Sequence, residues 1–206
     1  MFLYPDKDYF LTDVFLLSSG TSKIESNYIA PIYTETQNRF LPQDANNRFL
    51  FVPFDNDGFI TYGSLPLSRG IDPTSLGVGR YARDTISFEV TSIFNGETQE
   101  GLVIGSVEHD TWKSAIRMTG SPLSQACINK LECYSGATHS ITRDATDNNW
   151  LQPHGAVKGT KIKSARMLVG LFDDWRTGME TFGDVNALIA PKREWNNPTP
   201  FGWNSW

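Results

Sequence analysis

The clearest pattern along the chain is an alternation of apolar and polar side chains with a period of two residues. Residues 86–94 place alternate apolar side chains on one face of an extended segment. The turn-forming pair Asn95–Gly96 ends this segment, and a second apolar run follows at residues 101–105. The pattern predicts a β-hairpin.

Other short apolar segments predict further strands. Tyr9–Leu17 is an apolar cluster that ends at a Ser-Ser-Gly turn, which suits a strand better than a helix. Arg48–Phe54 and Phe59–Tyr62 flank the turn sequence Asp55–Gly58, and together they predict a second hairpin. The turn also resembles part of a calcium loop, but the third spaced ligand and the later glutamate are missing, so a turn is favoured.

A late strand is predicted over residues 161–171. After it, the spacing of the apolar residues changes. Apolar residues recur near the helical period over residues 174–189, which predicts one helix. Asp173 or Asp174 can cap its start, and Trp175 is expected to anchor it against the sheets. The late strand is expected to place Ala165, Met167, Val169 and Leu171 on one face and Ser164, Arg166 and Leu168 on the other.

Many short β segments and one late helix predict an all-β fold, a β-sandwich with a C-terminal connecting helix. Residues 1–172 are expected to form the sandwich domain, and residues 173–206 the connecting helix and a linker. Pro191 ends the helix, and two further prolines make Glu194–Pro200 extended. No repeat of fixed period is present, which disfavours a propeller or solenoid.

Composition narrows the possible partners. The 206 residues suffice for one sizeable domain, and the net charge of −5, without a lysine or arginine run, predicts no nucleic-acid or membrane partner. No apolar run reaches the roughly 20 residues of a membrane span. The start at Met1 lacks the features of a signal peptide. The location of the protein is therefore unknown, and an extracytoplasmic location requires that a signal peptide was removed.

Candidate chemistry in the sequence is sparse, and no cofactor or metal is expected. Cys127 and Cys133 lack the spacing of a zinc site. A local disulfide between them and two buried free thiols both stay open as alternatives. In the triplet Glu108–Asp110, only the two acids can converge on one side of a strand, and solvated charges at a strand end are favoured. His139 and His154 share no ligand spacing with the histidine of that triplet.

The last residues, Pro200–Trp206 (PFGWNSW), resemble the P-x-G-W-N-S-W signature that opens the catalytic barrel of α-galactosidases in glycoside hydrolase families 27 and 36. Gly101–Lys113 and Phe172–Gly178 are similar, more loosely, to segments of the N-terminal β-domain of bacterial α-galactosidase-like proteins. The resemblance implies a galactose-mutarotase-like supersandwich, a connecting helix, and a stub of the first barrel strand at Trp203–Trp206.

The resemblance also implies the function. In those families two carboxyl groups on later barrel strands carry out a retaining mechanism, and the chain stops before them. We therefore expect a non-catalytic accessory domain whose main partner is the missing C-terminal barrel, with galactoside glycans as a further partner. Trp206 would line the sugar pocket of the barrel. Trp150 and Trp112 are candidates for stacking on sugars, and packing against other parts of the protein is the alternative role for each.

Two other functions stay open at this point. One is an independent carbohydrate-binding module that recognises galactose-containing glycans through exposed aromatic rings. The other is a mutarotase-like enzyme, which requires a histidine and a glutamate that converge in a cleft of the sandwich. No motif supports the second.

Overall fold

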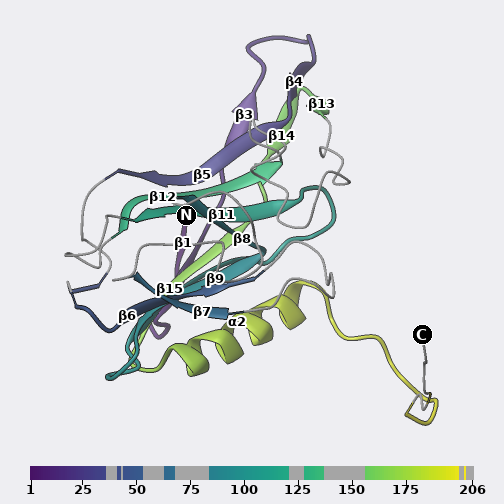
Figure 1. The fold of residues 1–206 in the computed structure, drawn as a ribbon. Helices are drawn as coiled ribbons and strands as arrows, with labels where there is room; N and C mark the ends of the chain where they lie inside the picture. Colours follow the sequence, from purple (N-terminus) through teal and green to yellow (C-terminus); the bar gives the residue numbers. More distant parts are fainter. Residues whose placement is uncertain are drawn as a thin grey trace.

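A computed structural model describes residues 1–35, 41–42, 44–52, 63–67, 84–120, 128–136, 156–199 and 202. Two β-sheets pack against each other, and a helix covers the outer side of the larger sheet (Figure 1). This arrangement confirms the predicted all-β sandwich with a C-terminal connecting helix.

The larger sheet has seven strands and the smaller sheet four, in the described part of the chain. The larger sheet runs, in spatial order, through β1 (Phe2–Leu3), β2 (Tyr9–Thr12), β15 (Met167–Phe172), β10 (Gly101–Ser106), β9 (Val90–Asn95), β6 (Asn47–Phe51) and β7 (Gly63–Pro66). The smaller sheet runs through β5 (Tyr28–Thr34), β12 (Ile128–Gly136), β11 (Ser114–Gly120) and β8 (Asp84–Phe88).

Two short antiparallel ladders project from one end of the sandwich as an arm (Figure 1). They pair β14 (Lys161–Lys163) with β3 (Phe15–Leu17), and β13 (Val157–Gly159) with β4 (Ile24–Ser26). All three residues of β3 are exposed, whereas Ile162 of β14 is buried in a small core cluster with Trp112.

The main core lies between the two sheets. Ile104 and Met167 of the larger sheet meet Ile116 and Leu131 of the smaller sheet there, and each is at most 1% exposed. A second cluster joins the larger sheet to the helix through Leu168, with partners from the helix such as Phe182. Burial of apolar surface on both sides of the larger sheet therefore holds three layers together.

The predicted strand over residues 86–94 is two strands in different sheets. β8 ends at Phe88 in the smaller sheet, and β9 begins at Val90 in the larger one. Glu89 between them has φ 64°, a left-handed conformation that is uncommon outside glycine. The apolar side chains do not share one face, because Ile86 and Phe88 pack in a cluster of the smaller sheet and Val90 packs against the cluster at the helix. The alternation does not reveal the single residue at which the chain changes sheets. The hairpin of β9 and β10 is confirmed.

Two more predicted strands are also broken, at neighbouring places. The segment Tyr9–Leu17 divides into β2 and β3 at Asp13 and Val14, and residues 161–171 divide into β14 and β15 at residues 164–166. The breaks are joined, because the Val14 amide donates to Ser164 Oγ at 3.0 Å and the Ser164 amide donates to the Val14 carbonyl at 2.9 Å. Here both strands leave the larger sheet and enter the arm.

The face assignment for the late strand holds only in its middle. Met167 and Val169 face the core between the sheets, and Leu168 faces the helix. Ala165 lies in a separate small cluster, while Leu171 is 48% exposed. Because the chain breaks before β15, Ala165 lies outside the strand and does not follow its alternation.

The second predicted hairpin is described in part. β6 pairs antiparallel with β7. The turn Asp55–Gly58 and the segment Phe59–Tyr62 lie outside the described residues.

The helix α2 (Trp175–Ile189) begins one residue later than predicted. Asp174 caps it, with Oδ1 accepting from the Arg176 amide at 2.9 Å, and Trp175 stacks on Phe94 with ring centroids 4.4 Å apart. Gly178 lowers the helix propensity but permits close packing, since a Cβ there would lie 2.5 Å from the Phe172 ring. The predicted cap and anchor are confirmed.

Candidate functional site

The loop between β10 and β11, residues 107–113, borders a pocket of about 510 Å³ beside the end of α2. The pocket lies where the chain leaves the helix, so it combines residues far apart in sequence. Its lining residues come from Val107–Trp112, Lys163–Ala165 and Ile189–Ala190.

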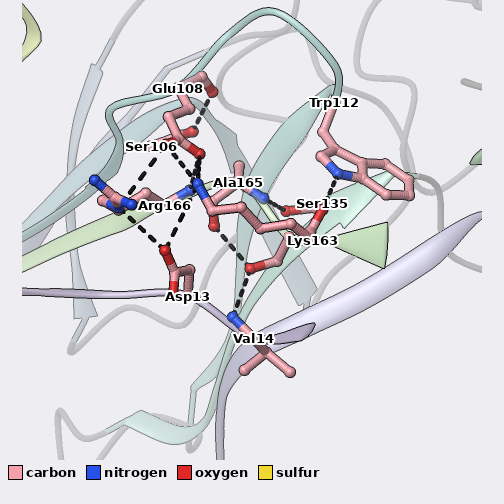
Figure 2. Close-up of polar contacts among 10 residues, drawn as sticks. Asp13, Val14, Ser106, Glu108, Trp112, Ser135, Lys163, Ala165 and Arg166 are labelled. Carbon is pink, nitrogen blue, oxygen red and sulfur yellow. Dashed lines mark hydrogen bonds and ion pairs between the residues drawn. The ribbon is translucent and has the colours of Figure 1, made fainter. Parts of the chain in front are cut away.

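A network of four charged side chains holds one side of this loop (Figure 2). Lys163 Nζ donates to both carboxylate oxygens of Glu108 at 2.6 Å. Asp13, with a side chain only 4% exposed, accepts from Arg166 Nε at 3.1 Å and lies 3.6 Å from Lys163 Nζ. Two carboxylates thus balance two cations. Asp13 and Arg166 lie in the breaks of the predicted strands, Lys163 ends β14, and Glu108 belongs to the loop after β10.

Neutral hydrogen bonds complete the support around this network (Figure 2). The Trp112 indole N–H donates to the Lys163 carbonyl at 2.7 Å, and the Ala165 amide donates to Ser135 Oγ at 2.8 Å. The Arg166 amide donates to Glu108 Oε2 at 3.1 Å. Each of these groups fixes a backbone segment that would otherwise bury an unsatisfied polar atom.

His109 holds the other side of the loop through two partners. Its Nδ1 lies 2.7 Å from Glu89 Oε2, and its Nε2 lies 2.7 Å from Oδ1 of Asn186 on α2. The orientation of the Asn186 amide is fixed, because its Nδ2 donates to the Phe182 carbonyl at 2.9 Å. Both ring nitrogens therefore face acceptors, and the imidazole must carry both protons to donate to them.

The electrostatics of His109 agree with this geometry. The hydrogen bond to Glu89 is the main cause that raises the pKa of His109 from 6.5 to about 9, partial burial opposes it, and Asn186 and the charge of Asp110 add to the rise. At neutral pH the residue is an imidazolium that links the loop to the helix. We call the set Glu89, His109 and Asn186 the histidine clamp.

The expectation of solvated charges in the triplet was wrong for Glu108, whose side chain is 21% exposed and paired with Lys163. The triplet lies in a loop after β10 and not in a strand, and His109 is exposed but bonded to Glu89. Asp110 is also exposed, and it makes no hydrogen bond or ion pair with the residues that the structure describes. No local signal could have revealed the partners, which lie 55 residues away for Glu108 and 20 and 77 away for His109.

Of the three candidate tryptophans, the structure describes Trp112. Trp112 is 5% exposed, packs in a small cluster with Ile162 and Ala165, and lines the pocket. Its burial favours packing over an open stacking face. Trp150 and Trp206 lie outside the described residues.

The remaining candidate residues add no chemistry. His139, His154 and Cys127 lie outside the described residues, while Cys133 is a buried free thiol whose pKa is raised by burial. Among the residues described, no group of three metal-ligating side chains gathers in one place. Within that same part of the chain, no helix has the length and apolarity to cross a membrane.

A second charged cluster lies on the outer face of the smaller sheet. Glu132, 6% exposed, accepts from the Tyr28 hydroxyl and lies 3.7 Å from Arg117 and 3.4 Å from Lys130. Its Oε2 receives no hydrogen bond from the described residues. This cluster borders no described pocket, so the loop at residues 107–113 remains the better candidate.

No protein-family model matches the chain, and no curated protein matches it.

Proposed function

We propose that the chain is a non-catalytic N-terminal accessory domain of an α-galactosidase-like glycoside hydrolase, which packs beside the catalytic barrel and supports it. The proposal starts from the resemblance of Pro200–Trp206 to the opening of such a barrel. The order of sandwich, connecting helix and extended segment agrees with that resemblance.

The observation that carries the non-catalytic role is that Glu108 and His109, at the pocket, are both used to hold the loop. Both oxygens of Glu108 accept from Lys163, and both nitrogens of His109 face acceptors. A general base must be placed to take a proton from a substrate, whereas these two side chains are placed on partners within the domain. The same bonds make the loop a rigid rim, which suits a supporting surface.

The exit of the helix favours contact with another folded unit. Leu188 and Trp195 are 79% and 63% exposed, on either side of Ala190 at the pocket rim. Beyond α2 the chain runs away from the sandwich (Figure 1). These exposed side chains are available for contact with a neighbouring folded unit.

The first test measures hydrolysis. The purified 206-residue chain is incubated with 4-nitrophenyl α-galactoside, and we expect no release of nitrophenol above the rate of a heat-denatured sample. Robust turnover by the chain would sink the proposal.

The second test reads the coding sequence beyond Trp206. We expect a barrel of about 250 residues with two carboxylates on later strands. If the reading frame encodes a different domain, or stops directly, the accessory role beside a barrel is wrong.

A carbohydrate-binding module is the second candidate, and the pocket at the loop favours it. Its volume of about 510 Å³ lies in the range of small-molecule sites. A mutarotase-like enzyme fits less well: a histidine and a glutamate do converge at His109 and Glu89, but both protons of the imidazole are committed.

A further inference from the structure

We propose that the pocket beside residues 107–113 binds one neutral sugar ring, with the Asp110 carboxylate accepting hydrogen bonds from its hydroxyl groups. The inference rests on the proposed function for its choice of sugar as ligand, and it assigns that domain a binding site of its own.

The lining of the pocket offers the two kinds of contact that a sugar ring needs. Ile189 and Ala190, which are both exposed, provide apolar surface against which ring C–H groups can pack. Asp110 supplies a carboxylate that accepts from up to two hydroxyl groups, and it is exposed at the tip of the loop. Ligand sites commonly combine a largely apolar lining with a few polar groups that fix orientation.

The rim is already held in position before any ligand arrives. Glu108 fixes the loop to the arm on one side, and His109 fixes it to α2 on the other. Trp112 anchors its end through the bond to the Lys163 carbonyl. Asp110 lies between these fixed points, so placing its carboxylate on a ligand costs little ordering of the backbone.

The charges favour a neutral ligand over an anionic one. Lys163 is the lysine that lines the pocket, and Glu108 occupies its ammonium group at 2.6 Å. The imidazolium of His109 is paired with Glu89 in the same way. Of the charged side chains in the lining that the structure describes, Asp110 is left without an ion pair, and its carboxylate attracts hydroxyl donors and repels phosphates and carboxylates.

The test is a titration of the ¹⁵N-labelled full chain with galactose, with glucose and galacturonate as companions. We expect saturable shifts of the amides of residues 107–113 with Kd on the order of 1 mM for a neutral sugar, and much weaker shifts with galacturonate. Absence of saturable shifts with both neutral sugars up to about 100 mM would overturn the site.

Three variants locate the binding. Asp110→Ala should weaken it by about fivefold or more, because a charge-assisted hydrogen bond is lost. Ala190→Trp, at an exposed position on the rim, should fill the pocket and abolish it. Glu97→Gln, an exposed acid in the turn at the other end of β10, is the matched control and should change nothing.

The outcomes separate this inference from the accessory role. Shifts that survive both Asp110→Ala and Ala190→Trp would place the sugar elsewhere and refute the site, whatever the hydrolysis assay shows. Binding that responds to the variants, together with turnover by the chain, would keep the site and refute the non-catalytic role.

Discussion

Glu108 and His109 are adjacent in the same loop, yet they hold it by two different kinds of contact. Glu108 belongs to a network in which Asp13 is 4% exposed and Glu108 itself 21% exposed. His109 and Glu89 form a pair that is 43% and 40% exposed, with Asn186 of α2 as the third member. The network around Glu108 joins the loop to the residues at the strand breaks. The histidine clamp joins the loop to the helix.

The difference in exposure predicts different consequences. A buried network has already lost its hydration, so removing one member leaves the opposite charges without compensation. An exposed pair is screened by water and contributes less, but it can lose its proton over an accessible range of pH. The network therefore determines whether the loop folds, and the clamp determines how firmly the helix is held.

Asp13→Asn should have the largest effect. It removes one of the two negative charges opposite Lys163 and Arg166. We expect the free energy of unfolding to fall by about 3 kcal/mol. This value is near the lower end for a broken buried pair because the two cations are partly exposed. The measurement is equilibrium unfolding in urea, compared with the wild-type chain.

Glu25→Gln is the matched control for this substitution. Glu25 pairs with Lys158 at 2.9 Å across the arm, but the two side chains are 52% and 61% exposed. Its removal should cost less than about 0.5 kcal/mol. Equal effects of the two substitutions would contradict the distinction between the buried network and the surface.

The fold was predictable where local pattern decides it. The alternation before Asn95–Gly96 gave the hairpin of β9 and β10, and the Asp174 cap with Trp175 gave the start of the helix within one residue. The changes of direction were not predictable. Glu89 carries no local signal for its positive φ, which is stabilised by bonds to Ser114 and Ser106 from distant strands.

The candidate site was predictable only in part. From the sequence, stacking and packing are both open for Trp112, and its burial favours packing. The alternation expected for Glu108 and His109 requires a strand, whereas the structure has a loop there. The partners depend on which strands become neighbours, a property of the tertiary fold. Nothing near Lys163 indicates that its ammonium lies beside residue 108.

The histidine clamp should make stability depend on pH, with a moderate effect. The pKa of His109 is raised from 6.5 to about 9 in the folded chain, so the clamp contributes fully below pH 6.5 and is lost as the pH rises through about 9. Because the pair is exposed by more than a third, we expect a loss of about 1 kcal/mol across this window.

The measurement compares the wild-type chain with His109→Gln, which cannot titrate in this range. The wild-type advantage in unfolding free energy should be larger at about pH 6 than at about pH 9.5. A difference that stays constant, or grows with pH, would show that His109 is not held as an imidazolium.

Among the substitutions in the contacts that hold the loop, Asn186→Ala should have the smallest effect on stability and the most local one. It removes the bond from His109 to α2 and the side-chain bond to the Phe182 carbonyl, both at a partly exposed position, so we expect a cost of about 0.5–1 kcal/mol. Amide exchange should speed up in the last two turns of α2 while β10 and β15 stay protected, because the helix is still packed through Phe182 and Val185. Uniform acceleration across the sheet would contradict the view that the clamp acts on the helix alone, since only a global loss of stability would expose those strands.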